Sequence, residues 1–110
     1  MNERISRSME TISVDLETRS ALDLKKSGAY RYAMDPGTGV WCVAWCFGEQ
    51  EIRVWEPGEP VPEKIVLYAG KGGVFSAWNA QFERLIWQHI LFPRYGWPEL
   101  GAGQWRCTQA

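Results

Sequence analysis

Apolar and polar residues alternate near the start of the chain. Ile12, Val14 and Leu16 are separated by single polar residues, so they share one face of an extended segment. A period of two over β-branched residues predicts a strand, which we place at residues 11–17. Residues 40–47 are apolar throughout, which is typical of a strand covered on both faces.

The pattern downstream predicts a hairpin, a crossover and a final helix. A turn at Gly48 leads into an alternating strand at residues 51–55, nearer an edge. A helix over residues 62–69 with proline in its first turn and an apolar strand over residues 74–78 come next. Asn79 then caps a helix that runs from Ala80 to about Leu91 and stops before Pro93. Its apolar stripe comprises Phe82, Leu85, Ile86, His89 and Ile90.

The order of these elements predicts an α/β class. Residues 21–39 are expected to be irregular, with a short helix around residues 21–26, and residues 104–108 open a further element. A right-handed helical crossover after the hairpin returns the fourth strand beside the first and parallel to it. Both strands then end on the same side of the sheet, where ligand sites of such sheets lie.

Composition narrows the class of protein. With 110 residues there is room for one domain, and seven Trp, four Tyr and four Phe exclude a disordered chain. A net charge of −1 gives no basic footprint for nucleic acid, although an enzyme that holds its substrate through metal ions needs fewer basic residues. The sequence has neither a membrane helix nor a secretion signal, and three cysteines, an odd number, favour the reducing cytosol. Residues 1–10 are predicted to be a mobile leader.

Three acidic residues are candidates for a metal-binding catalytic site. Asp15 and Glu17 project from the same face at the carboxyl end of the first strand, where a divalent cation such as Mg²⁺ would relieve their repulsion. The alternative is a solvated strand face. Glu83 lies in the first turn of the last helix, which the crossover brings next to these acids, although an acid there also stabilises the helix dipole. Asn79 is either only a cap or also a substrate contact.

The residues around these acids resemble a known family. Residues 15–20 (DLETRS) resemble the first motif of the DEDD family of 3′–5′ exonucleases, and residues 79–84 (NAQFER) resemble its second. Residues 28–33 and 104–108 are similar to stretches of the proofreading domain of phage-type family A DNA polymerases. The resemblance runs from about Ile12 to the last residue, so that residues 11–110 look like the N-terminal part of such a domain.

This resemblance implies a ribonuclease H-like fold and hydrolysis of DNA from its 3′ end with two Mg²⁺ or Mn²⁺ ions. In the family, the acid matching Asp15 bridges both ions and the one matching Glu17 binds the ion that carries the attacking water. Glu83, where the family commonly has Asp, supports the other ion. On the substrate side, the resemblance implies that Thr18 contacts the terminal nucleotide and that Phe82 or its neighbours help to line the pocket, and Asn79 is a candidate contact.

The resemblance also implies partners and a setting. We expect a single-stranded DNA 3′ end as substrate, a polymerase domain in the full-length protein, and the cytoplasm of a bacterial cell or phage-infected host. The family's third motif has no match here, so we expect a domain that is incomplete at its C-terminus, is weakly active or inactive, and self-associates through exposed apolar surface. The alternative is a catalytically silent structural or DNA-tethering module.

Other features have structural interpretations. Cys42 and Cys46 are spaced too far apart on a strand to share a zinc ion and are predicted to be buried thiols. Residues 70–73 (GKGG) precede a strand, so they are not a phosphate loop, and His89 is predicted to lie in the core. Tyr30 and Tyr32 belong either to a flexible segment that contacts DNA or to a packed loop. Five tryptophans are predicted to be core residues: Trp41, Trp45, Trp55, Trp78 and Trp87.

Overall fold

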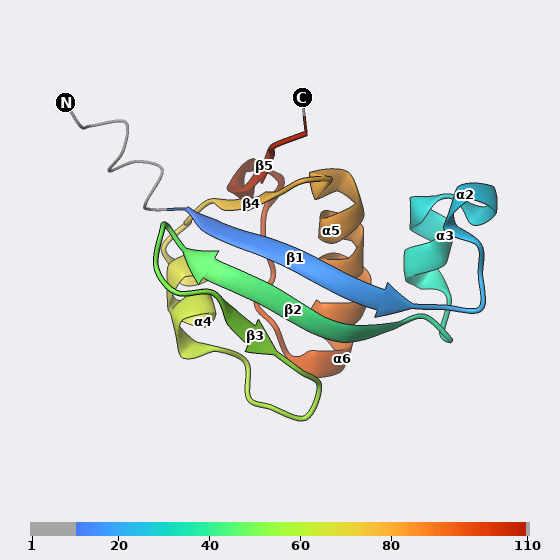
Figure 1. Ribbon diagram of the computed structural model, residues 1–110, viewed down its shortest axis with the longest axis horizontal. Coiled ribbons are helices and arrows are strands. Elements are labelled where there is room, and N and C mark those ends of the chain that lie inside the picture. The colour runs from blue at the N-terminus through green and yellow to red at the C-terminus, as the bar shows by residue number, and fades with distance from the viewer. Residues whose placement is uncertain (1–10, 110) are drawn as a thin grey trace.

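A five-stranded mixed sheet organises the structure (Figure 1). The computed structural model describes residues 11–109. The strands are β1 (Ile12–Arg19), β2 (Gly39–Phe47), β3 (Arg53–Trp55), β4 (Phe75–Ala77) and β5 (Trp105–Cys107). Their spatial order is β3-β2-β1-β4-β5, with β2 antiparallel to both β1 and β3. β4 runs parallel to β1, and β5 runs parallel to β4.

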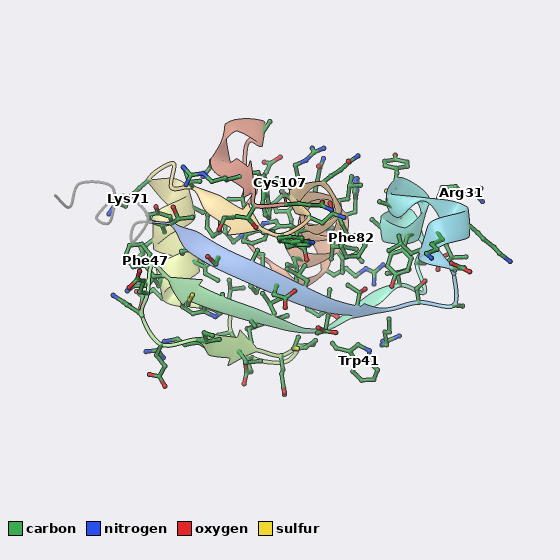
Figure 2. All side chains as sticks on the ribbon, turned by 45° about the horizontal axis from the view of Figure 1, so that its top comes forward. Arg31, Trp41, Phe47, Lys71, Phe82 and Cys107 are labelled. Carbon is green, nitrogen blue, oxygen red and sulfur yellow. The ribbon has the colours of Figure 1, made fainter. Side chains whose placement is uncertain are left out.

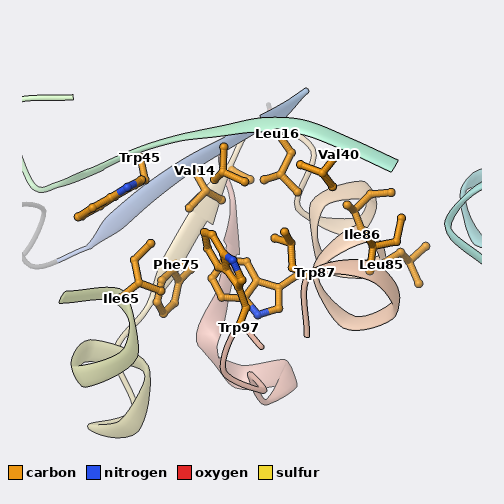
Figure 3. Close-up of a cluster of buried hydrophobic side chains, with 14 of the residues drawn as sticks. Val14, Leu16, Val40, Trp45, Ile65, Phe75, Leu85, Ile86, Trp87 and Trp97 are labelled. Carbon is orange, nitrogen blue, oxygen red and sulfur yellow. The ribbon is translucent and has the colours of Figure 1, made fainter. Parts of the chain in front are cut away.

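Helices cover one face of this sheet. In Figure 1, α4, α5 and α6 lie behind the strands, and α2 and α3 lie beyond the carboxyl end of β1. Figure 3 shows α4 and α5 on the same side of β1 and β2. The helices are α2 (Leu24–Ser27), α3 (Ala29–Met34), α4 (Glu63–Gly70), α5 (Ala80–Ile86) and α6 (Phe92–Tyr95), with a π-helical turn η1 (Trp87–Leu91) and a 3₁₀ turn η2 (Ala102–Gln104).

The predicted α/β class and topology are confirmed. The hairpin, the helical crossover and a fourth strand parallel to the first are all present, and the strand order and directions are those of a ribonuclease H-like sheet. The helix predicted over residues 62–69 is α4. The element predicted at residues 104–108 is η2 followed by β5, which extends the sheet beyond β4.

The core lies between the sheet and the helices. Along β1, every second residue from Ile12 to Leu16 is buried, as the alternating pattern predicts. Figure 3 shows Val14 and Leu16 pointing from the sheet toward Phe75 and Trp87. Phe75 and Trp87 meet edge-on with ring centroids 5.2 Å apart. Such aromatic pairs add about 1 kcal/mol each beyond the area that they bury, so this contact stabilises the packing of η1 against β4.

Pro93 does not stop the last helix, so that prediction is wrong. The helix continues from α5 through η1 into α6 and ends at Gly96, which has a left-handed φ of 77°. In η1, the Phe92 backbone N–H donates to Trp87, five residues back, which widens the turn by one residue. Pro93 therefore falls in the first turn of α6, where a missing N–H is tolerated.

Two of the five tryptophans predicted as core are exposed. Trp45, Trp55 and Trp87 are buried, but the exposed fractions of Trp41 and Trp78 are 61% and 66%. Trp78 follows the last residue of β4, and Trp41 lies at an irregularity of β2. Sequence alone does not locate strand ends or irregularities, because these depend on pairing with distant residues.

Several smaller predictions need correction. Residues 21–39 contain two short helices. The first, α2, overlaps the helix predicted around residues 21–26, and Asp23 caps it by accepting a hydrogen bond from the Lys25 backbone N–H at 3.0 Å. The second, α3, falls where an irregular segment was predicted. Cys42 and Cys46 are half-buried rather than buried. The predicted leader, residues 1–10, lies outside the described residues. Within residues 11–109, no helix is long and apolar enough to cross a membrane.

Candidate active site

Glu83 of α5 reaches the backbone of β1. Its Oε2 accepts a hydrogen bond from the Leu16 backbone N–H at 3.4 Å, across 67 residues of sequence. Pairing between β1 and β4 is confined to Ile12 and Ser13, so the edge of β1 beyond them is available to a side chain. Leu16 lies between Asp15 and Glu17, and the Glu83 carboxyl group therefore meets β1 between the other two acids.

The start of α5 positions Glu83. Asn79 accepts a hydrogen bond from the Phe82 backbone N–H at 3.4 Å, the capping role predicted from the sequence. Glu83 then falls in the first turn of the helix with only 7% of its surface exposed. The helix dipole favours its negative charge there, but burial opposes it.

Burial is the larger effect on Glu83. The pKa of Glu83 is raised to about 7, chiefly by burial and to a lesser degree by the charge of Asp15, while the hydrogen bond from Leu16 lowers it. Asp15 and Glu83 are therefore close enough to repel each other. Near neutral pH, Glu83 exchanges a proton easily, and a cation at this position would favour its ionised form.

Asp15 and Glu17 lie on the face of the sheet opposite the helices. Both are exposed, in alternation with the buried Val14 and Leu16. Burial and then the charge of Glu17 raise the pKa of the Cys42 thiol, which pairs with Glu17 across β1 and β2. This face is therefore electrically negative at the carboxyl end of β1.

The donor atoms suit a hard cation in kind. All three acids offer carboxylate oxygens, the ligands that Mg²⁺ and Mn²⁺ prefer. Among the residues that the structure describes, however, no three His, Cys, Asp or Glu side chains are grouped closely enough to hold a metal ion. The charge of Asp15 acts on Glu83, but Asp15, Glu17 and Glu83 do not form a group of three.

Tyr32 of α3 joins two of the predicted substrate residues. Its hydroxyl lies 2.9 Å from Thr18 Oγ1, and its ring centroid lies 5.8 Å from that of Phe82. Figure 2 shows Phe82 between α5 and α3. Tyr32 is buried, so of its two predicted roles, contact with DNA from a flexible segment or packing, the structure favours packing. The sequence singles out Tyr32, because it lies in the family-like stretch at residues 28–33. It does not indicate which residues Tyr32 contacts.

A groove of about 200 Å³ opens beside this cluster. It lies between α2, α3 and the N-terminus of α5, and its walls include Asn79 and Phe82. Asn79 uses its side-chain oxygen for the cap, which leaves its amide nitrogen as a donor. The groove is thus apolar at Phe82 and polar at Asn79, a combination suited to holding a planar polar group.

His89 is half-buried and contacts the ring of Tyr30 edge-on, with centroids 5.6 Å apart. The prediction that His89 lies in the core is therefore wrong, because it is absent from the buried cluster and packs against a surface tyrosine. Tyr30 itself is 58% exposed.

Comparison with known proteins finds a relative among phage polymerases. The chain is 32% identical over 107 residues to a DNA polymerase of Bacillus phage SP02, and the alignment covers 91% of this chain. It covers 15% of the polymerase, so the chain spans a small part of that protein's length. No family model and no solved structure matches. The chain is therefore related to a segment of a phage DNA polymerase.

Proposed function

We propose that this chain is part of a 3′–5′ exonuclease domain that removes nucleotides from DNA 3′ ends, as the proofreading part of a DNA polymerase. The observation that carries the proposal is the contact of Glu83 with β1 between Asp15 and Glu17. It brings an acid from the second family-like motif to the backbone of the strand that carries the two acids of the first. The similarity to a phage polymerase supports the polymerase setting.

Each acid has a distinct role in this proposal. Asp15 and Glu83 would hold one Mg²⁺ or Mn²⁺ ion, and Asp15 and Glu17 a second. Such ions activate a water and stabilise the leaving oxygen of a phosphodiester. Glu83 must lose its proton to become a ligand, and its raised pKa makes cation binding compete with protonation below about pH 7.

The groove beside α5 would take the terminal nucleotide. Phe82 offers a ring for a base to stack on, and Asn79 offers an amide N–H₂ to a polar edge. The Thr18 hydroxyl is held by Tyr32 at 2.9 Å and would contact the sugar. Stacking does not depend on base identity, as removal of any terminal nucleotide requires.

A degradation assay tests the proposal. With a 5′-labelled single-stranded oligodeoxynucleotide and Mn²⁺, we expect slow shortening from the 3′ end that EDTA stops. Asp15→Asn and Glu83→Gln should remove it, and Glu49→Gln, an exposed acid in the turn after β2, should not. Shortening that persists in Asp15→Asn would contradict the assignment of the acids. Total inactivity of the wild-type chain in a longer polypeptide that includes the polymerase domain would contradict the nuclease itself.

The second candidate is a catalytically silent structural or DNA-tethering module with the same fold. It is favoured by one observation: within residues 11–109, no three acids are grouped to hold a metal ion. The two candidates differ in their response to metal. A nuclease should gain thermal stability from Mn²⁺, and Asp15→Ala should lose that gain, whereas a silent module should melt identically with and without the ion.

A further inference from the structure

Trp41 is exposed although it lies in a strand whose other large residues are buried or partly buried. The exposed fraction is 61% for Trp41, compared with 4% for Val40 and 0% for Val43. The register explains the difference. Glu17 pairs with Cys42 and Thr18 pairs with Val40, so Trp41 is the extra residue of a β-bulge. Figure 2 shows its side chain projecting away from the sheet at the carboxyl end of β1.

Arg19 lies against this exposed ring. The central carbon of its guanidinium group is 5.8 Å from the centroid of the Trp41 ring. Arg19 pairs with Gly39 across β1 and β2, and a Cβ atom on Gly39 would lie 3.1 Å from a guanidinium nitrogen. The missing side chain of Gly39 thus makes room for the guanidinium group beside the indole. A stacked guanidinium keeps its N–H edge for an anion.

Arg19 lies close to the candidate acids along β1. Arg19 is two residues beyond Glu17, roughly 7 Å along an extended strand. That is close to the length of one nucleotide in an extended single strand. The acids repel phosphate unless cations neutralise them, whereas Arg19 attracts it. A strand whose end lies at the acids would therefore meet a cation and an aromatic ring one step further along.

We propose that Arg19 and Trp41 form a second binding site for single-stranded nucleic acid, here named the Arg19–Trp41 platform. A base stacks on the open face of Trp41, and Arg19 contacts the adjoining phosphate. The site extends the proposed function, on which it rests for the direction of the strand. It also gives the bulge a role. Without the bulge, regular alternation along β2 would turn residue 41 toward the buried face, with Val43 and Trp45, and away from Arg19.

Equilibrium binding tests the platform on the full 110-residue chain. The probe is a fluorescein-labelled oligothymidylate with phosphorothioate linkages, which resist hydrolysis, and fluorescence anisotropy in Mg²⁺ gives Kd. We expect Trp41→Ala to raise Kd about 5- to 100-fold, the usual effect of losing one stacked base. Trp41→Phe should restore most of the affinity. Arg19→Gln should lower the slope of log K against log salt by about 0.7.

Matched controls separate stacking from general effects. Phe92→Ala removes another exposed aromatic side chain, on α6, and should leave Kd unchanged. With a probe of abasic sugar phosphates, Trp41→Ala and the wild type should bind equally.

The platform and the nuclease can fail separately. Unchanged Kd in Trp41→Ala, or no binding by the wild type, would overturn the platform even if the chain shortens DNA. Weaker binding by Trp41→Ala with no hydrolysis in any context would keep the platform and remove the nuclease. If Trp41→Ala instead abolishes self-association in sedimentation and leaves Kd unchanged, Trp41 is an interface residue and the platform is wrong.

Discussion

Glu83 closes the open edge of β1 at Leu16, where the neighbouring strand β4 has already ended. A backbone N–H at a sheet edge normally pairs with another strand or with water. Here a carboxyl group from a helix takes that place, and it is buried as a result. The short length of β4 therefore has a chemical consequence, because it admits an acid to the interior side of a negatively charged strand end.

The first prediction concerns the pH dependence of stability. The pKa of Glu83 is raised from its ordinary 4.5 to about 7, so the folded protein binds more protons than the unfolded chain between these values. Its contribution to stability is complete below pH 4.5 and is lost as pH rises through 7. Glu83→Gln should remove this loss and be more stable than the wild type at pH 8, by up to about 3 kcal/mol. Urea unfolding at several pH values measures it.

Glu49→Gln is the control for that experiment, because it removes one exposed acid without changing the core. Its stability should follow the wild-type curve at each pH. Parallel curves for Glu83→Gln and the wild type between pH 5 and pH 8 would show that Glu83 titrates normally and is not buried as described.

The second prediction separates the two roles of Asn79. Asn79→Ala removes the cap of α5 and should destabilise the protein by about 1 kcal/mol, a fall in Tm of roughly 4–8 °C. Asn79→Ser keeps a capping oxygen but loses the amide N–H₂ group. It should therefore keep the Tm and weaken oligonucleotide binding. Wild-type affinity in Asn79→Ser would make Asn79 a cap alone.

The third prediction concerns the hydroxyl pair of Thr18 and Tyr32. Either Thr18→Val or Tyr32→Phe leaves one buried or half-buried hydroxyl without its 2.9 Å partner, which should destabilise by about 1–2 kcal/mol. The double variant should lose much less than the sum of the two single losses. A double-mutant cycle by thermal or urea unfolding measures this coupling, and strict additivity would mean that the hydrogen bond contributes nothing.

The fourth prediction concerns the turn between α4 and β4. A Cβ atom on Gly73 would overlap the ring of Tyr68, which packs edge-on against Phe75. Gly73→Ala should therefore destabilise by about 1–3 kcal/mol through overpacking. Gly103→Ala is the matched control, since a Cβ atom there has no neighbour within 4 Å. Equal stability of the two variants would mean that Tyr68 moves freely.

The local patterns of the sequence predict most of the fold. The alternation of β1 and the cap at Asn79 depend only on residues that are close in sequence, and both occur as predicted. The bulge at Trp41 and the passage of the helix through Pro93 could not be predicted in this way. Both depend on hydrogen bonds whose register is set by the wider structure.

The candidate site is predictable to a similar extent. The parallel arrangement of the first and fourth strands follows from the crossover rule, and it implies that Glu83 lies near Asp15. The burial of Glu83, its shifted pKa and its contact with Leu16 depend on where β4 ends. The sequence leaves the role of Tyr32 open for a similar reason, because its contacts with Thr18 and Phe82 depend on how α3 packs against α5.

Isothermal titration of Mn²⁺ into the wild-type chain and Glu83→Gln, near pH 7 in two buffers of different ionisation enthalpy, tests the shared cation site most directly. We expect the wild type to bind Mn²⁺ and release a proton as Glu83 ionises, so that the measured heat depends on the buffer. Glu83→Gln should bind more weakly, with heats that no longer depend on the buffer. Equal affinity and equal heats for the two proteins would contradict the account, because Glu83 would then not be a ligand.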